Sequence, residues 1–321
     1  MPETPDAPEY SLIIPVYRNE ESLPDLLVEL AQLAQGLDRP LEVVFVVDGS
    51  PDRSHAHLAE RLPAAPFASQ LILLSRNFGS FAAIREGLSH ARGKYFAVMA
   101  ADLQEPPQLV REFFRLLASD AADVTLGTRT GRDDPFIDRI ASRLFWSTYR
   151  RLVQPELPAG GVDMFGCNQA FRDQLLRFEE SNSSLVGQVI WLGFRRAEVP
   201  YHRVARRHGK SAWTFSRKLH YLMNSVFSFT DLPIRLLTLA GLGGIVICAA
   251  FGLLVAVLRL SGWVAVPGYS ATILTILFFG ALNLLGFGIV GSYVWRAYEN
   301  TKRRPQAVVF HHKNFSGKSD V

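Results

Sequence analysis

The chain has 321 residues, of which 48% are hydrophobic and 20% charged, and its formal net charge at pH 7 is +4. Its two cysteines, Cys167 and Cys248, lie far apart and form no Cys-x-x-Cys or Cys/His cluster, which argues against a disulfide framework and a zinc site. The mild basic excess suits nucleic acid, phosphate ligands or a membrane surface, so the distribution of the charges must decide between them.

The first part of the chain predicts alternating strands and helices, and its acidic, proline-rich start has no apolar run that would predict a signal peptide. The predicted strands are Tyr10–Pro15, Leu41–Val47, Leu71–Leu74, Tyr95–Met99 and Asp123–Leu126, and the predicted helices run from Ser22 to about Gly36, from Gly79 to Ala91 and from Gln108 to Ala118. Apolar strands with short connections predict a parallel, doubly wound α/β sheet. Right-handed crossovers would bring every carboxyl end to one rim, where such sheets bind ligands.

Polar side chains follow the predicted strands and should gather at this rim. They are Glu20, Asp48, Arg76, Asp102 and Arg129. Asp102 and Gln104 come directly after an apolar strand and before the Pro106-Pro107 pair that opens a helix. Their oxygens would suit Mg²⁺ or Mn²⁺ carrying a diphosphate. The alternative is an aspartate-rich turn that caps the following helix.

Two apolar runs near the C-terminus predict transmembrane helices. Leu236–Leu258 contains no charged residue, and Ala271–Trp295 contains Asn283 as its one strongly polar residue. Each run exceeds the roughly 20 residues that a span requires. The loop between them carries one basic residue, whereas both flanks carry many, so the positive-inside rule places both termini in the cytoplasm. The basic charge is therefore assigned to membrane and phosphate, with no nucleic-acid partner.

The segment before the first span predicts an amphipathic helix. Apolar side chains recur at steps of four and three from Phe215 to Phe229, while Arg217 and Lys218 occupy another face. Such a helix is typical of the membrane interface, the alternative being a helix packed on the soluble domain. The expected organisation is a cytoplasmic domain (1–212), this juxtamembrane helix (213–233), two spans (234–298) and a loose basic cytoplasmic tail (299–321) containing His311 and His312. Ala240, Gly244 and Asn283 point to helix packing or to contacts in a homo-oligomer.

Six short segments occur in the order found in family 2 glycosyltransferases. They are Pro15-Val16-Tyr17-Arg18-Asn19-Glu20, Val47-Asp48-Gly49-Ser50, Arg76-Asn77-Phe78-Gly79, Asp102-Leu103-Gln104-x-Pro-Pro, Gly127-Thr128-Arg129 and Arg206-x-x-Gly209-x-Ser211. With two spans after the soluble domain, the chain most resembles the polyprenyl-phosphate and dolichyl-phosphate sugar transferases of this family. The resemblance implies a GT-A fold, a Rossmann-like α/β domain that binds a nucleotide-sugar donor. It also implies a divalent metal, inversion at the anomeric carbon and a polyprenyl phosphate acceptor at the bacterial inner membrane.

The resemblance also implies roles for individual residues. Nucleotide-sugar binding falls to Pro15, Tyr17, Glu20, Asp48, Ser50 and Arg76, the metal to Asp102 and Gln104, and acceptor phosphate to Arg129, Arg206, Lys210 and Ser211. Asp102 is thereby placed in catalysis, together with Asp163 as the acceptor-side carboxylate. The alternative for Asp163 is a helix cap or a turn residue.

The chain departs from the family pattern at three positions. Ala100 and Val47 stand where acids are common, and Gln169 stands where arginine is usual. A metal would then take more of its ligands from donor phosphate and water, as Mg²⁺ tolerates. Two alternatives to polyprenyl phosphate transfer stay open here: an acceptor that is a glycolipid or lipid-linked saccharide, and a non-catalytic membrane scaffold that has lost part of its metal site.

Overall fold

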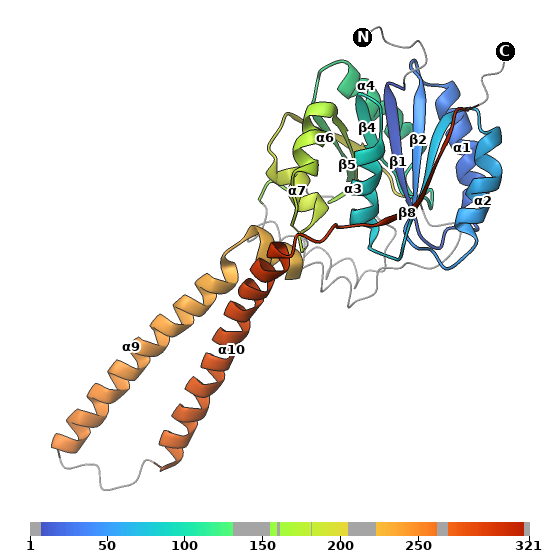
Figure 1. Cartoon of the computed structure of the whole chain (residues 1–321). Helices are drawn as coiled ribbons and strands as arrows, with labels where there is room; N and C mark the ends of the chain where they lie inside the picture. The colour runs from blue at the N-terminus through green and yellow to red at the C-terminus, as the bar shows by residue number, and fades with distance from the viewer. Residues whose placement is uncertain are drawn as a thin grey trace.

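The computed structural model describes residues 8–130, 155–158, 161–180, 182–204, 223–261 and 269–317. They form an α/β domain from which two long helices project as a pair (Figure 1). The strands are β1 (Tyr10–Val16), β2 (Leu41–Val47), β3 (Ala68–Leu74), β4 (Tyr95–Val98), β5 (Val124–Arg129), β6 (Val162–Asn168), β7 (Arg196–Tyr201) and β8 (Val309–Phe315). The helices are α1 (Leu23–Gln35), α2 (Ser54–Arg61), η1 (Leu62–Ala64), α3 (Ser80–His90), α4 (Pro107–Ala118), α6 (Gln169–Leu176), α7 (Leu185–Trp191), α9 (Leu232–Leu260) and α10 (Tyr269–Thr301).

The eight strands form one mixed sheet in the order β7-β5-β6-β4-β1-β2-β3-β8. The pairs β1–β2, β1–β4, β2–β3 and β5–β7 are parallel, whereas β6 runs antiparallel to β4 and β5, and β8 antiparallel to β3. The expected GT-A-type α/β core is confirmed, and the five strands that the sequence predicted, β1 to β5, run parallel to one another. The sheet as a whole is not parallel, because β6 and β8, which the sequence did not predict, run antiparallel to their neighbours. β6 starts at the rim where β5 ends and runs back beside it, so this pair requires no crossover.

The hydrophobic core has two layers, one on each face of the sheet. Helices α1, α2 and α4 cover one face, and α3, α6 and α7 cover the other (Figure 1). β2 is buried along its whole length, as expected for a strand covered on both faces. Ser22 does not cap α1 with its side chain: its hydroxyl donates to the Ala101 carbonyl oxygen at 2.9 Å and joins the loops after β1 and β4.

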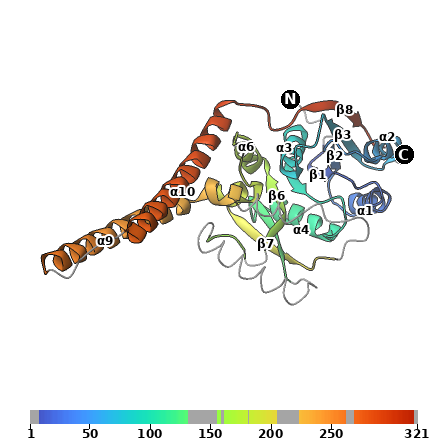
Figure 2. The same ribbon diagram turned by 90° about the horizontal axis from the view of Figure 1, so that it is seen from below.

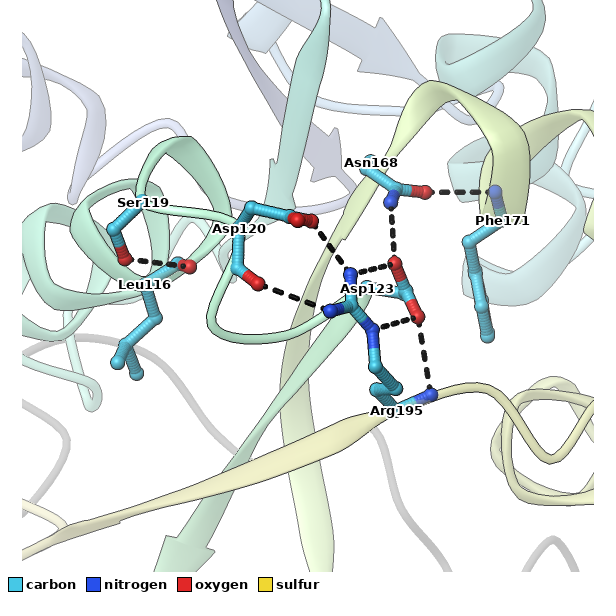
Figure 3. A network of polar contacts seen from close by, with 7 residues as sticks. All are labelled: Leu116, Ser119, Asp120, Asp123, Asn168, Phe171 and Arg195. Carbon is cyan, nitrogen blue, oxygen red and sulfur yellow. Dashed lines mark hydrogen bonds and ion pairs between the residues drawn. The ribbon is translucent and has the colours of Figure 1, made fainter.

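A polar network holds the sheet together at the end opposite the rim (Figure 3). Arg195, which precedes β7, donates to Asp123 Oδ1 at 2.9 Å and also contacts Asp120. Asn168 donates to the same Asp123 oxygen at 2.9 Å and accepts from the Phe171 amide, which caps α6. The guanidinium of Arg195 lowers the pKa of Asp123 by hydrogen bonding. These contacts tie β5, β6 and β7 together at this end of the sheet. The opposite ends of the three strands lie at the rim.

The C-terminal segment is a strand, and the prediction of a loose tail is wrong. β8 pairs with the edge of β3, and the Ser75 amide donates to the Val308 carbonyl oxygen at 2.9 Å. His312 Nε2 lies 2.8 Å from Oε1 of the buried Gln70. Figure 2 shows the chain leaving α10 and passing α3 to reach the far edge of the domain. Without β8, the edge of β3 would have unpaired backbone groups, so it provides a pairing partner for this segment. The sequence of the segment alone does not predict this pairing.

The two predicted spans coincide with α9 and α10. Windows of mean hydropathy 2.3 (Leu232–Leu254) and 1.5 (Phe278–Thr301) are long enough to cross a bilayer, and only 6% and 0% of their residues are buried. Core helices of a soluble domain would be covered, so this exposure indicates a membrane. Gly244 packs on α10, since a Cβ there would lie 3.3 Å from Phe279 Cε1. This contact assigns Gly244 to helix packing within the chain.

Only the end of the predicted juxtamembrane helix falls within the described residues. Residues 223–229 are helical. Ser228 donates to the Asn182 carbonyl oxygen at 2.7 Å, and Phe229 lies so close to Gly187 of α7 that a Cβ on that glycine would meet its ring at 2.4 Å. This part of the helix therefore packs on the soluble domain next to the membrane helices.

Candidate active site

One side of the rim is built from the loops after β1, β2 and β3. Asp48 directly follows β2 and is 2% exposed, and its two carboxylate oxygens accept from the Phe78 and Gly79 amides at 2.7 and 2.9 Å. Burial raises the pKa of Asp48, although these amides and Arg76 oppose the shift. Asp48 therefore fixes the segment that presents Arg76, whose guanidinium stacks 4.0 Å from the Phe78 ring centroid.

Gly49 permits this close approach of two loops. Its φ is +55°, and a Cβ would lie 2.2 Å from the Arg76 carbonyl carbon. We expect Gly49→Ala to destabilise the protein by about 2 kcal/mol or more, through a disfavoured backbone conformation plus displacement of the Arg76 segment. Thermal unfolding in detergent measures the effect, with Gly252→Ala in open space on α9 as the control. Equal melting temperatures for the two variants would contradict the predicted clash.

The loops after β1 and β2 are tied by a second set of contacts. Ser50 Oγ accepts from the Arg18 amide at 2.8 Å and donates to Asp52 Oδ1 at 2.6 Å. Asp52 Oδ2 accepts from the Glu20 amide at 3.1 Å, and Glu20 Oε2 accepts from the Arg53 amide at 2.9 Å. These contacts join the loops that carry Glu20, Asp48, Ser50 and Arg76, here called the donor wall; Pro15 lies in β1 and Tyr17 directly follows it. Sequence reasoning missed Asp52, whose signal was its place in the turn after β2.

The loop after β4 carries the predicted metal ligands. Asp102 is partly exposed, and its Oδ1 accepts from the Gln104 amide at 3.3 Å. Gln104 Oε1 accepts from Arg203 at 2.8 Å, and the Gln104 carbonyl oxygen accepts from the Val204 amide at 2.9 Å. The segment after β7 is therefore bound to the predicted metal loop. Sequence reasoning missed Arg203, which lies just before the family-like Arg206 segment.

Glu105 is a buried acid beside these residues, and sequence reasoning also missed it. Its side chain is 3% exposed, Oε1 lies 3.8 Å from Arg203, and Oε2 has no hydrogen-bond partner among the described residues. Burial, together with the charges of Asp102 and Asp163, raises the pKa of Glu105 to about 7, against the opposing charge of Arg203. Three carboxylates therefore share this part of the rim.

The raised pKa predicts a stability that depends on pH. From pH 4.5, the ordinary value for Glu105, to about 7, the folded protein keeps a proton that the unfolded chain has released, so stability falls as pH rises. We expect Glu105→Gln to remove this loss and to be more stable than wild type above pH 7, by at most about 3 kcal/mol. Melting temperatures in EDTA between pH 4.5 and 8.5 test this. A difference that does not change with pH would contradict the prediction.

Asp163 lies where the end of β5 meets the start of β6. Its Oδ2 accepts from the Tyr201 hydroxyl at 2.6 Å and is ion-paired with Arg129 Nε at 2.7 Å. Burial, followed by the Asp163 charge, strongly raises the pKa of Tyr201. Because Asp163 is within a strand and Asn168 caps α6, the cap-or-turn interpretation of Asp163 is wrong. Arg129, predicted to bind acceptor phosphate, contacts the predicted acceptor-side carboxylate.

The residues present fit a divalent cation only in combination with an anionic substrate. Among the described residues, no three acidic, histidine or cysteine side chains are grouped as a metal site. Asp102 and Gln104 offer a carboxylate and an amide oxygen, which suit Mg²⁺ or Mn²⁺ when diphosphate and water supply the other ligands. A cation would also offset the crowding of acids around Glu105. The other predicted phosphate ligands, Arg206, Lys210 and Ser211, lie outside the described residues.

Comparison with known proteins gives matches along most of the chain. A family model described as "Glycosyl transferase family 2" matches residues 11–178. Putative glycosyltransferase CsbB of Bacillus subtilis (strain 168) is 31% identical over 93% of this chain and 90% of its own. Undecaprenyl-phosphate 4-deoxy-4-formamido-L-arabinose transferase of Klebsiella pneumoniae subsp. pneumoniae is 31% identical over 94% of this chain and 93% of its own. Mannosyltransferase PcManGT from Pyrobaculum calidifontis, solved in complex with GDP-Man and Mn²⁺, aligns at 17% identity and a TM-score of 0.44 over 91% of this chain and 85% of its own.

Proposed function

The chain belongs to glycosyl transferase family 2, and we propose that it moves a sugar, with inversion, from a nucleotide-diphosphate sugar to polyprenyl phosphate at the cytoplasmic face of a bacterial inner membrane. The observation that carries the proposal is the rim, where the charges of Asp102 and Asp163 both act on Glu105 and Asp163 pairs with Arg129. A relative of nearly full-length coverage is named for undecaprenyl phosphate. Two exposed apolar helices follow the domain, as a lipid acceptor requires.

The rim residues divide the chemistry between donor and acceptor. A divalent metal on Asp102 and Gln104 would stabilise the charge of the nucleoside diphosphate as it leaves. The wall that contains Asp48 and Arg76 would position the donor, so that part of the rate comes from orientation. A phosphate monoester, with a second pKa of about 6, is already largely ionised at neutral pH and requires less help from a base than a sugar hydroxyl. Asp163, held by Tyr201 and Arg129, would orient the acceptor rather than remove a proton.

The two alternatives have less support. A glycolipid or saccharide-lipid acceptor would present a hydroxyl, for which a general base is required, and Asp163 Oδ2 is already paired with Arg129. A non-catalytic scaffold is not favoured, because the chain belongs to a family of glycosyltransferases and keeps Asp102 at the rim despite Ala100 and Val47. Polyprenyl phosphate is therefore the acceptor we propose.

A direct transfer assay tests the proposal. Full-length protein in detergent receives a panel of labelled nucleotide-sugars, Mn²⁺ or Mg²⁺, and undecaprenyl phosphate, with undecaprenol as the matched lipid that lacks the phosphate. We expect label in the lipid phase only with the phosphate and a divalent cation. Product on a saccharide lipid but not on the monophosphate would support the glycolipid alternative. Nucleotide-sugar binding absent across the panel, with no labelled lipid, would support the scaffold.

A further inference from the structure

An open pocket of about 340 Å³ lies where α10 meets the soluble domain. One wall is α10, which contributes Phe287, Gly288, Gly291, Ser292, Trp295 and Arg296. The opposite wall has two asparagines, Asn182 before α7 and Asn224 in the helical residues 223–229. Figure 1 shows this junction, where the end of α10 lies against the short helix beneath the α/β domain. The pocket is thus apolar toward the membrane and polar toward the domain.

Arg296 places a positive charge in this pocket. Its two terminal nitrogens donate to the Asn182 carbonyl oxygen at 3.1 Å and to Asn224 Oδ1 at 2.9 Å, and its guanidinium lies 5.1 Å from the Phe227 ring centroid. No described carboxylate lies within ion-pair distance of it, whereas Lys302, Arg235 and Arg129 each have one. Arg296 lies at the end of α10 that meets the domain, next to the interfacial Trp295, where an anionic headgroup can supply the counter-ion that the described residues do not.

The membrane side of the pocket has room for an acyl chain. A Cβ added at Gly288 or Gly291 would meet no atom within 4 Å, so α10 is open there. Phe287 is 75% exposed beside the glycines, while Trp295 and Tyr298, 58% and 55% exposed, lie at the polar end as interfacial aromatics do. The side chains of α10 therefore indicate both the depth of a lipid headgroup and the direction of its acyl chain.

We propose that this pocket binds an anionic glycerophospholipid of the cytoplasmic leaflet, with its phosphodiester on Arg296 and an acyl chain along Gly288 and Gly291. One guanidinium balances the single negative charge of a phosphodiester, and the two asparagines suit a hydroxylated headgroup such as that of phosphatidylglycerol. None of the described rim residues lines the pocket, and the proposed lipid is a second one, separate from the sugar acceptor. The bound lipid would fix α10 against the domain.

Two variants separate lipid binding from structural roles of Arg296. Arg296→Gln removes the charge, while Gly291→Leu keeps Arg296 and fills the space beside it. Gly280→Leu, also in open space on α10 but outside the pocket, and Arg303→Gln, just beyond α10, are the matched controls. Native mass spectrometry of the full chain, titrated with phosphatidylglycerol, phosphatidylcholine or undecaprenyl phosphate, gives the affinity of each.

We expect wild type to prefer phosphatidylglycerol to phosphatidylcholine, and both pocket variants to bind phosphatidylglycerol about fivefold more weakly or worse, with both controls unchanged. Equal phosphatidylglycerol binding by wild type and the two pocket variants would overturn the site. Loss of undecaprenyl phosphate binding alone would overturn the phospholipid assignment and make the pocket part of the acceptor path. Competition by inorganic phosphate as strong as by phosphatidylglycerol would overturn the lipid requirement.

Discussion

An Asp102→Asn variant is expected to lose turnover on the order of 10²–10³-fold while keeping its fold. Asparagine preserves the size of the side chain and an oxygen that accepts from the Gln104 amide, but it removes the negative charge that would hold a metal on the donor diphosphate. Ala100 cannot compensate, because it provides no second acid at this loop. The loss should therefore fall on the chemical step and on metal affinity together.

Steady-state transfer rates and Mn²⁺ binding measured by electron paramagnetic resonance check this result. Asp120→Asn is the matched control, since Asp120 is a largely exposed acid in the network at the opposite end of the sheet. Melting temperatures establish that both variants are folded. Wild-type turnover and Mn²⁺ affinity in Asp102→Asn would show that the metal is held elsewhere, with Glu105 the next residue to replace.

The second large effect is expected at Asp163. With donor and lipid both saturating, Asp163→Asn should lower turnover about 100-fold, because the carboxylate that would orient the acceptor loses its charge and its pairing with Arg129. Tyr201→Phe removes one 2.6 Å hydrogen bond to the same oxygen and leaves Arg129 in place. Its cost should be about tenfold, equivalent to one hydrogen bond to a charged group.

The relative sizes of the effects of Asp163→Asn and Tyr201→Phe distinguish the possible roles of Asp163. If Asp163 orients the acceptor, Tyr201→Phe should act mainly on the KM for the lipid, while Asp163→Asn lowers kcat. Full turnover in Asp163→Asn under saturating conditions would remove it from the mechanism. A Tyr201→Phe effect as large as that of Asp163→Asn would instead point to a structural role for the trio, which unfolding measurements would detect.

Local sequence patterns predicted most of the fold. Apolar runs such as Leu41–Val47 and the spans on α9 and α10 were found because hydrophobic periodicity and length are properties of neighbouring residues. β6 was not predicted, since its antiparallel direction depends on pairing with β4 and β5, which lie far from it in the chain. β8 was missed for the same reason: its exposed residues make a strand only when the edge of β3 is available.

The residues of the candidate site also separate into those that local sequence predicted and those whose contacts only the tertiary structure revealed. Asp102, Gln104 and Asp163 were identified from short motifs, because each follows or begins a strand in a recognisable order. The pairing of Asp163 with Tyr201 and Arg129 joins residues 38 and 34 positions apart, and no local spacing encodes it. Arg203 on Gln104, at a separation of 99 residues, is a further case.

By itself, the sequence determined the class of the domain and the membrane helices, because composition and local periodicity act within a few turns of the chain, and it predicted which residues would supply oxygen ligands. Only the tertiary structure decided which charges meet. Burial between packed elements raises the pKa of Glu105, and packing holds Asp48 against the amides of the segment after β3 and sets Arg296 beside two asparagines. Such effects depend on distance and solvent exclusion, which exist only once the sheet, the helices and the bilayer-facing surface have been assembled.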